Sequence, residues 1–496
     1  MKTARSTHHH RPARWLRFGL TILALLLTAV AMLSYTVESL KERPRALARY
    51  VEHRVSVHNT VVAQAAERLA ALLAWLDQPL ELRPRPEDLR LGAQAGPLPR
   101  PGAADAGAQV VPVASTDDAV QAIQRARPGD HLTFAPGTYR FSGTSIAVNR
   151  AGTRVAPIVL KADSPETVFL EFDMTEGFVV SAPYWIFENM NIRGVCAKHA
   201  DCEHAFHVVS RASHFVARNN TVSDFNAHIK INGADGSFPD HGLIEGNTLS
   251  NQSIRETQSS VTPIDLVAAS RWTVRDNWIS DFVKGGADRV SYGAFAKGAG
   301  FGNSFERNVV VCEHLLQRAP GQRVGISLGG GGTGKDYCRD ARCITEQDGG
   351  TVQSNLIVSC SDEGIYLNRA ATSQIHHNTL LDTGGISVRF VESSAEVQGN
   401  LVDGAIRSRD GGVLRGNDNI QTSVTRLYLG SHPVRGLYRN LADLDLAWSA
   451  SAPRRRQSGP AAPDLCGSAR RAQAAYGAFE DFSACVRPRP GNAPLR

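Results

Sequence analysis

A short pattern of apolar and polar positions recurs along the middle of the chain. An apolar residue is followed by two variable residues, an asparagine, one variable residue and a second apolar residue. Seven asparagines carry the pattern: Asn220, Asn247, Asn277, Asn308, Asn355, Asn378 and Asn400. A repeat with a period in this range is the sequence signature of a solenoid, in which each repeat adds one coil to a continuous core.

Each asparagine lies in a short segment that alternates apolar and polar positions, as a half-buried strand does. A buried asparagine amide can bond to the asparagine of the next coil, the ladder found where like strands stack in register. A second set of short strands precedes the asparagine strands, at 205–208, 228–231, 263–266, 294–297, 325–328, 364–367, 385–388 and 405–408. We therefore predict an all-β fold, a single-stranded right-handed parallel β-helix.

The second set of strands defines one face of this solenoid. We align the set on Phe206, Ile229, Ile264, Phe295 and Ile326 as inward residues, so that period two turns the following residues outward. The outward column then reads His207, Lys230, Asp265, Ala296, Ser327, Tyr366, Ser387 and Arg407. Glycines and alanines line one flank of these strands, and small residues let a ligand approach the backbone closely. The pattern predicts a polar groove for a polymer.

The N-terminal region contains one membrane candidate. Residues 18–37 are uncharged and apolar, about the length that a bilayer requires. Arg11, Arg14 and Arg17 precede the run and predict a cytoplasmic tail over residues 1–17. This predicts a single-pass protein of the bacterial inner membrane with its C-terminal domain in the periplasm. The alternative is a signal peptide cleaved near Ala29-Val30-Ala31, which leaves a secreted protein.

Four further regions follow. We predict a juxtamembrane helix over 38–78, whose heptad-like stripe either forms a homo-oligomer or packs on the end of the solenoid. Residues 79–109 are rich in proline and form a semi-rigid linker. The β-helix domain covers 110–420, with a helix near Thr116 to cap its first coil. Residues 421–496 form a C-terminal coil and cap.

Composition narrows the choice of compartment and partner. The formal net charge is +6 over 496 residues, and the basic residues form no single cluster, so we expect no nucleic-acid partner. The eight cysteines include no Cys-x-x-Cys pair and fit an oxidising compartment. Proximity favours four pairs without fixing the connectivity: Cys196 with Cys202, Cys312 with Cys360, Cys338 with Cys343, and Cys466 with Cys485.

Three segments carry a resemblance to known proteins. Residues 119–139, with Pro128-Gly129-Asp130, resemble the opening of pectate-lyase-like parallel β-helix proteins. Residues 152–162, with Ala156-Pro157-Ile158, are similar to the early coils of polysaccharide lyase family six, which includes alginate lyases and chondroitinase B. The ending at 477–480 resembles the last coil of many secreted β-helix proteins. Over residues 110–480, the resemblance implies β-elimination on a uronic-acid polymer.

The resemblance also implies a site. It places a lysine base on a middle coil, which Lys297 approaches, and an arginine on the next coil, for which Arg323 and Arg389 are the nearest substitutes. The substrate carboxylate must be neutralised by calcium or by clustered donors. The positions before Lys297 hold Val290, Tyr292 and Ala294 where the family would supply acidic calcium ligands. Calcium therefore remains only an implication of the resemblance, and we assign no cofactor.

We single out two groups of residues on the predicted groove. The candidates for acid–base chemistry are Lys297, His228, Lys230, Tyr366 and Asp265, since neighbouring His, Lys and Asp side chains tune a base. The candidates for substrate binding are Asn232, Arg389, Arg323, Asn368, Arg369 and His207. Arg389 and Asn232 would hold a carboxylate, and Asp265 would orient a base. Lys297 takes the inward parity, two residues after Phe295.

Several functions remain open at this stage. Elimination and epimerisation need the same base. A glycoside hydrolase would use Asp362 and Glu363 with Asp265 as its carboxylates. A non-catalytic glycan-binding or envelope scaffold protein would need none of these groups. Residues 329–335 match part of a phosphate loop. However, Asp336 replaces the required Ser or Thr, and no strand–helix unit surrounds the run. We therefore interpret these residues as a tight backbone segment that forms the base of the groove.

Overall fold

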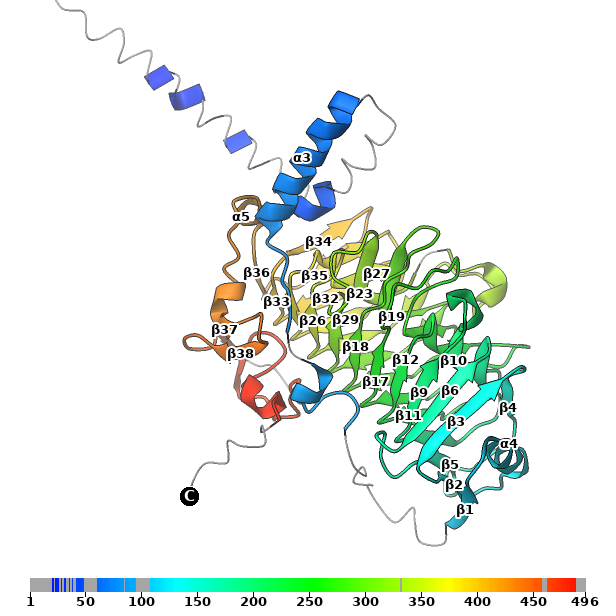
Figure 1. The fold of residues 1–496 in the computed structure, drawn as a ribbon. Helices are drawn as coiled ribbons and strands as arrows, with labels where there is room; N and C mark the ends of the chain where they lie inside the picture. The colour runs from blue at the N-terminus through cyan, green and yellow to red at the C-terminus, as the bar shows by residue number, and fades with distance from the viewer. Residues whose placement is uncertain are drawn as a thin grey trace, which may run out of the picture.

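A computed structural model describes residues 42–48, 60–83, 85–94, 108–330, 332–456 and 462–487, together with single residues between 20 and 38. In these residues the strands form three long parallel sheets, and each coil adds one strand to each sheet in a fixed order (Figure 1). The architecture is a parallel β-helix, which confirms the solenoid predicted from the asparagine pattern.

The first strand of each coil enters a twelve-stranded sheet. In spatial order its strands are β1 (Gln109–Val113), β2 (Asp130–Phe134), β5 (Ile158–Lys161), β8 (Trp185–Glu188), β11 (Val216–Arg218), β14 (Leu243–Glu245), β17 (Thr273–Arg275), β21 (Ser304–Glu306), β25 (Thr351–Gln353), β29 (Ser373–His376), β32 (Ser394–Gln398) and β35 (Val413–Arg415).

The second strand enters an eleven-stranded sheet. It consists of β3 (Gly137–Ser142), β6 (Val168–Asp173), β9 (Asn191–Gly194), β12 (Thr221–Ser223), β15 (Thr248–Ser250), β18 (Trp278–Ser280), β22 (Val309–Val311), β26 (Leu356–Val358), β30 (Thr379–Leu381), β33 (Leu401–Val402) and β36 (Ile420–Gln421).

The third strand enters a ten-stranded sheet, which contains the second set of strands predicted from the sequence. It consists of β4 (Ile146–Val148), β7 (Glu176–Val180), β10 (His204–Val209), β13 (Ala227–Asn232), β16 (Ile264–Val267), β19 (Val290–Lys297), β23 (Gln322–Leu328), β27 (Ile365–Asn368), β31 (Gly385–Arg389) and β34 (Ala405–Arg409).

Shorter elements edge the solenoid. A three-stranded sheet contains β20 (Gly300–Phe301), β24 (Gln347–Asp348) and β28 (Ala370–Ala371), and the C-terminal region forms two antiparallel pairs, β37 (Tyr438–Asn440) with β38 (Asp445–Trp448) and β39 (Arg454–Arg456) with β40 (Gln473–Ala475). The helices are α3 (Thr60–Asp77), α4 (Thr116–Arg125) and α5 (Val424–Tyr428), with short 3-10 turns at η1 (Pro86–Asp88), η2 (His199–Asp201), η3 (Lys335–Tyr337), η4 (Arg435–Leu437) and η5 (Phe482–Cys485).

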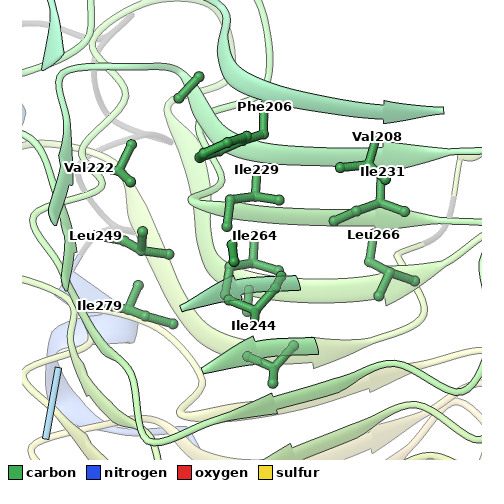
Figure 2. Packing of buried hydrophobic residues seen from close by; sticks show 14 of the residues in the cluster. Phe206, Val208, Val222, Ile229, Ile231, Ile244, Leu249, Ile264, Leu266 and Ile279 are labelled. Carbon is green, nitrogen blue, oxygen red and sulfur yellow. The ribbon is translucent and has the colours of Figure 1, made fainter. Parts of the chain in front are cut away.

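The interior is built from columns of apolar side chains. Figure 2 shows Phe206, Ile229 and Ile264 stacked on successive strands of the ten-stranded sheet, facing a second column from the eleven-stranded sheet. All three are fully buried. Because the strand period is two, each inward residue sends its neighbours to the outer face. The core therefore fixes which polar side chains reach the surface.

The asparagine ladder forms as predicted. The Nδ2 group of Asn308 donates to Oδ1 of Asn355 at 3.0 Å, and its own Oδ1 accepts from the Nδ2 of Asn277 at 2.9 Å. The same bond links every neighbouring pair from Asn220 to Asn400. It continues to Asn419, one step beyond the predicted series. Each amide is satisfied without water, so an asparagine can stay buried at these turns.

The register differs from our alignment at one coil. Asp265 pairs with Phe295, and Ile264 pairs with Ala294, so Phe295 faces outward rather than inward. The interior at this level is filled by other large rings, and the phenyl ring of Phe282 would lie 3.1 Å from a Cβ added at Gly293. The predicted inward position of Lys297 is therefore wrong: this side chain also faces outward.

Both ends of the solenoid are covered. Helix α4 packs Ala119 and Ile123 onto the first coil, and its first turn is capped by the Oγ of Ser115, which accepts from the Asp118 N–H at 3.1 Å. At the other end, α3 packs against α5 (Figure 1) through Ala70, Leu73 and Tyr428. Helix α4 thus shields the apolar edge of the first coil.

The segment after α3 lies along the outer face of the eleven-stranded sheet. Gly92 N–H donates to the Asp276 carbonyl at 2.9 Å, and Ala93 N–H donates to Oγ1 of Thr248 at 3.0 Å. Leu82, Leu89 and Leu91 join the C-terminal region in a second apolar cluster over this sheet. Much of this outer face is thus covered by the chain itself. On the ten-stranded sheet, the outward side chains of His207, Lys230 and Tyr366 are partly exposed, whereas those of Asp265, Phe295 and Ser327 are buried.

All four predicted disulfides form: Cys196–Cys202, Cys312–Cys360, Cys338–Cys343 and Cys466–Cys485. The predicted membrane segment at 18–37 lies largely outside the described residues. Within the part of the chain that the structure does describe, no helix is both long and apolar enough to cross a membrane.

Candidate active site on the ten-stranded sheet

Outward side chains of the ten-stranded sheet form two adjacent columns, which we call the candidate face. The first column, in register from β10 to β27, is His207, Lys230, Asp265, Phe295, Ser327 and Tyr366. The second column contains Asn232, Val267 and Lys297, and further along Asn368, Arg389 and Arg409. Successive residues in a column lie about 4.8 Å apart, the spacing of hydrogen-bonded strands.

Lys297 is the side chain on this face with the chemistry of a base. Its Nζ lies 4.4 Å from the centre of the Phe295 ring. Among the described residues it has no ion-pair or hydrogen-bond partner. Burial lowers the pKa of Lys297, and the nearby Lys230 ammonium lowers it further against an opposing effect of Asp265. A lysine held in this way loses its proton more readily than one in water.

An aromatic cluster surrounds Lys297. The rings of Tyr292 and Phe295 meet edge to face at 5.6 Å, and Phe238 packs on the same cluster. Burial raises the pKa of Tyr292 to about 12, with smaller contributions from Tyr366 and Asp362. Its phenol therefore keeps its proton at neutral pH and can serve as a donor. Our sequence reasoning missed Tyr292 as a donor because it considered this position only as a replaced calcium ligand.

Lys230 and Asp265 form an ion pair across neighbouring strands, with Nζ 2.9 Å from Oδ2. The lysine is partly exposed, whereas the carboxylate is almost fully buried, and its Oδ1 forms no hydrogen bond with any residue that the structure describes. One strand earlier, the His207 ring contacts Oε1 of Glu176 and Oδ1 of Asn232, both at 2.7 Å. The hydrogen bond with His207 lowers the pKa of Glu176. These contacts hold a cation, Lys230, and an amide, Asn232, on β13, two strands from Lys297.

Two predicted residues lie away from the surface of this face. His228 is fully buried, its Nε2 lies 3.0 Å from the Ser250 carbonyl, and burial lowers its pKa to about 4. Arg323 is also buried, with Nη2 2.6 Å from the Glu313 carboxylate. Neither side chain can reach a polymer without rearrangement, because each is fixed by partners inside the turns.

The remaining predicted residues gather at the later strands. Arg389 donates to Oδ2 of Asp410 at 2.5 Å and to the Tyr366 hydroxyl at 3.4 Å. The Arg369 guanidinium lies 5.8 Å from the centre of the Phe390 ring. Asn368 is nearly buried, and its Oδ1 has no partner. Burial raises the pKa of Tyr366 as well. The structure thus divides the predicted site into a Lys297 group and a Tyr366 group, with β23 between them.

Calcium does not fit the residues present. Across the described part of the chain, no group of three or more His, Cys, Asp or Glu side chains is placed to hold a metal ion. The strand before Lys297 instead contributes Tyr292 and an apolar ring. A hard cation of this kind requires several oxygen ligands. We therefore derive no chemical step through a metal.

The carboxylates proposed for hydrolysis are separated. Asp265 pairs with Lys230, whereas Glu363 is bound by Arg407. Their strands, β16 and β27, are three steps apart in the sheet, roughly 14 Å at the usual strand spacing. Glycosidase carboxylates lie about 5–9.5 Å apart. The geometry therefore disfavours this pair as a hydrolase site.

A cavity of about 710 Å³ lies elsewhere, between the end of α3 and the turns around Glu313 and Arg323. Its arginines are already paired with carboxylates: Arg45 with Asp382 and Arg323 with Glu313.

Comparison with known proteins agrees with this architecture. Residues 113–265 match the family model described as chondroitinase B. The fold is a pectate-lyase-like parallel β-helix. No curated protein matches the sequence significantly.

Several solved structures match this chain at low sequence identity. Pectate lyase Pel9A has 14% identity and a TM-score of 0.46, over 73% of this chain and 90% of that chain. An alginate lyase from Paenibacillus sp. str. FPU-7 has 15% identity and a TM-score of 0.37, over 63% and 99%. The family-six alginate lyase AlyGC has 13% identity and a TM-score of 0.33, over 63% and 51%.

Proposed function

We propose that this pectate-lyase-like protein cleaves an acidic polysaccharide by β-elimination on the candidate face. One observation carries the proposal: Lys297 is an unpaired lysine with a lowered pKa, half-enclosed by an aromatic cluster that also holds a protonated phenol. A base of lowered pKa beside an acid of raised pKa is the arrangement that proton abstraction with leaving-group protonation requires.

The reaction assigns a role to each group. The neutral amine of Lys297 takes the proton from the ring carbon that bears the carboxylate. The electron pair of that C–H bond becomes the new carbon–carbon double bond, and the bond to the glycosidic oxygen on the neighbouring carbon breaks. Tyr292 supplies the proton that the departing oxygen needs. Both side chains contact Phe295, which places acid and base beside one another.

The substrate carboxylate must be neutralised before its neighbouring proton can leave. Lys230 is suited to this role because its ammonium is partly exposed and is held in place by Asp265. The Asn232 amide, held by His207, would add a donor at the next position. Tyr366 and Arg389 would contact a sugar unit further along the face.

Epimerisation is the second candidate, since it begins with the same proton abstraction. It differs in returning a proton to the opposite face of the same carbon. The position of Tyr292 favours elimination, because Tyr292 and Lys297 contact the same Phe295 ring, whereas epimerisation needs its proton donor on the opposite face of the sugar. A glycan-binding protein without catalysis needs neither the base nor the acid.

We also propose that the N-terminal apolar run anchors the protein in the bacterial inner membrane, with the β-helix in the periplasm. The support is the uncharged sequence at 18–37 and the four disulfides, which suit an oxidising compartment. Fractionation with a protease-protection assay tests this placement: protection of the β-helix in intact cells and cleavage after outer-membrane permeabilisation support it.

The function is tested by incubating the purified chain with alginate, pectate, glycosaminoglycans and bacterial exopolysaccharides. We expect one of them to yield ultraviolet absorbance from an unsaturated sugar. Reducing ends without that absorbance would instead indicate hydrolysis. Exchange of solvent deuterium into the polymer without cleavage would indicate epimerisation.

Lys230 offers a test through pH dependence. The amine of Lys297 must be deprotonated to act, so kcat/KM should rise with pH through the pKa of Lys297. Lys230 lowers that pKa. Replacing Lys230 with Met should therefore raise it and move the rising limb of the pH profile to higher pH. Lys335→Met, which removes an exposed lysine from η3, is the matched control and should leave the limb in place. If the rising limb of the Lys230 variant does not move, Lys230 does not influence the pKa of the base.

Treatment with a chelator tests whether turnover requires a metal ion. We expect EDTA, followed by gel filtration, to leave the turnover rate unchanged, because the described residues provide no oxygen-rich ligand set near Lys297. The measurement is the initial rate before and after treatment, with and without added calcium. Loss of activity that calcium alone restores would show that a ligand set exists which our site description lacks.

A further inference from the structure

One end of the candidate face is closed by the segment that precedes α3. The Glu42 carboxylate lies 2.9 Å from Nη1 of Arg407 and 3.2 Å from Nη1 of Arg409. Both arginines belong to β34, the last strand of the ten-stranded sheet, where they continue the two outward columns in register after Ser387 and Arg389. An acidic side chain from the N-terminal region therefore occupies the end of the path along which a polymer would lie.

Arg407 is itself part of the closure. Its side chain is only 4% exposed, and its guanidinium also bonds to the carboxylate of Glu363. Glu363 precedes β27, two strands before β34, so Arg407 reaches back across β31. This reach places a buried cation between two acidic side chains, Glu42 and Glu363, at this end of the sheet.

The segment at residues 42–48, which carries Glu42, is fixed to the fold by buried ion pairs. Arg43 lies 2.8 Å from the Asp77 carboxylate at the end of α3 and 3.0 Å from that of Asp382 after β30. Arg45 pairs with the same two carboxylates, at 2.7 Å from Asp77. Removing one member of such a pair would leave a buried, uncompensated charge, so the two arginines hold the segment firmly. Glu42 is thus held next to β34 by its immediate neighbours in the chain.

The distance from the base to the closure is short. Lys297 ends β19, and the sheet continues through β23, β27 and β31 to β34. Four strand steps correspond to roughly 19 Å along the sheet. This length holds a short oligosaccharide and no more. In the other direction the face continues from β19 through β16, β13 and β10 to β7.

We propose that Glu42 and Arg407 make the enzyme act from a chain end. The end of the polymer would stop against Glu42, and each elimination at Lys297 would release a short oligosaccharide from that side. The Glu42 carboxylate also takes the place that a uronate carboxylate would occupy between Arg407 and Arg409, so the same two arginines would bind an additional acidic sugar once Glu42 is removed. This inference rests on the proposed function, because it assumes cleavage at Lys297.

The test follows viscosity and ultraviolet absorbance together on one long polymer, using the full chain. For the wild type we expect absorbance to rise while viscosity stays nearly constant, with short oligosaccharides as the first products. Glu42→Ala should increase the viscosity lost per bond broken severalfold and lengthen the early products. Glu38→Ala is the matched control, since Glu38 bonds to Thr425 away from this face and should behave as wild type.

A second measurement does not depend on the stability of the Glu42 variant. A polymer labelled at one end, and separately at the other, should release its label in the first products from only one of the two ends in the wild type. Cleavage with an early fall in viscosity, or an early product mixture without end preference, would overturn the inference and leave the proposed function standing. Absence of cleavage on every polymer would overturn the proposed function, and the inference with it.

Discussion

Replacing Lys297 with Met is expected to lower kcat by about 10²–10⁴-fold, the usual contribution of a positioned base. The substitution keeps the apolar stem over the Phe295 ring and removes only the amine, so the fold and the polymer-binding face should remain. Binding of the polymer by the variant should stay within a few-fold of wild type. Turnover is measured by ultraviolet absorbance and binding by calorimetry on the same preparations.

Two further variants test whether the loss of turnover in Lys297→Met is due to loss of the base or to loss of a positive charge. Lys335→Met removes the same charge from an exposed position and should keep full turnover. Tyr292→Phe should lower kcat at unchanged binding, because it deletes the phenol and keeps the ring against Phe295. If Lys297→Met keeps wild-type turnover, the base lies elsewhere and the site as described is incorrect.

The second large effect concerns stability. Asn308→Leu should lower the free energy of unfolding by on the order of 3 kcal/mol, since each orphaned buried polar group costs about 1–3 kcal/mol. The amide of Asn308 bonds to Asn277, Asn355 and the Val274 carbonyl, all within 3.0 Å. Leucine has a similar size but none of these groups, so neighbours on both adjacent coils lose partners.

Chemical denaturation followed by circular dichroism measures this effect. Asn149→Leu is the matched control, because Asn149 is exposed and lies outside the ladder. It should change the unfolding midpoint little. Equal stability of Asn308→Leu and wild type would mean that the ladder bonds contribute little to the stability of the fold.

The ladder also explains why the fold could be predicted from the sequence. An asparagine at a fixed offset from apolar residues marks the same turn of every coil, whatever the length of the loops between. This gave the coil order even where loop insertions separate Asn308 from Asn355. The pairing of Cys312 with Cys360 followed, because both lie shortly after ladder asparagines on adjacent coils.

The outward face was harder to predict. At β19 the residues Ala294, Phe295 and Ala296 are all apolar, so alternation alone does not reveal which one faces the core. We placed the large ring inward, but the interior there is occupied by Phe282, and the small alanines fit instead. Because of this one-residue shift, the Lys297 side chain faces the outer surface of the sheet and not the interior.

Contacts between distant segments were not predictable at all. Nothing in the local sequence around Glu42 indicates that it reaches Arg407 or Arg409, more than 360 residues away. Burial of Arg323 by Glu313 and of His228 in its turn likewise depends on loops whose course the repeat does not define. Sequence reasoning could therefore name polar candidates, but it could not decide which of them solvent or substrate reaches.

The most direct test of the account is the appearance of an unsaturated sugar. The full chain is used in detergent, because residues 79–83 and 85–94 pack against the β-helix and truncation would uncover that apolar surface. Wild type and Lys297→Met are incubated with the polymer panel, and absorbance is followed with time. The account predicts a rise with one acidic polymer for the wild type and almost none for the variant. An equal rise for both proteins, or none with any acidic polymer, would contradict it.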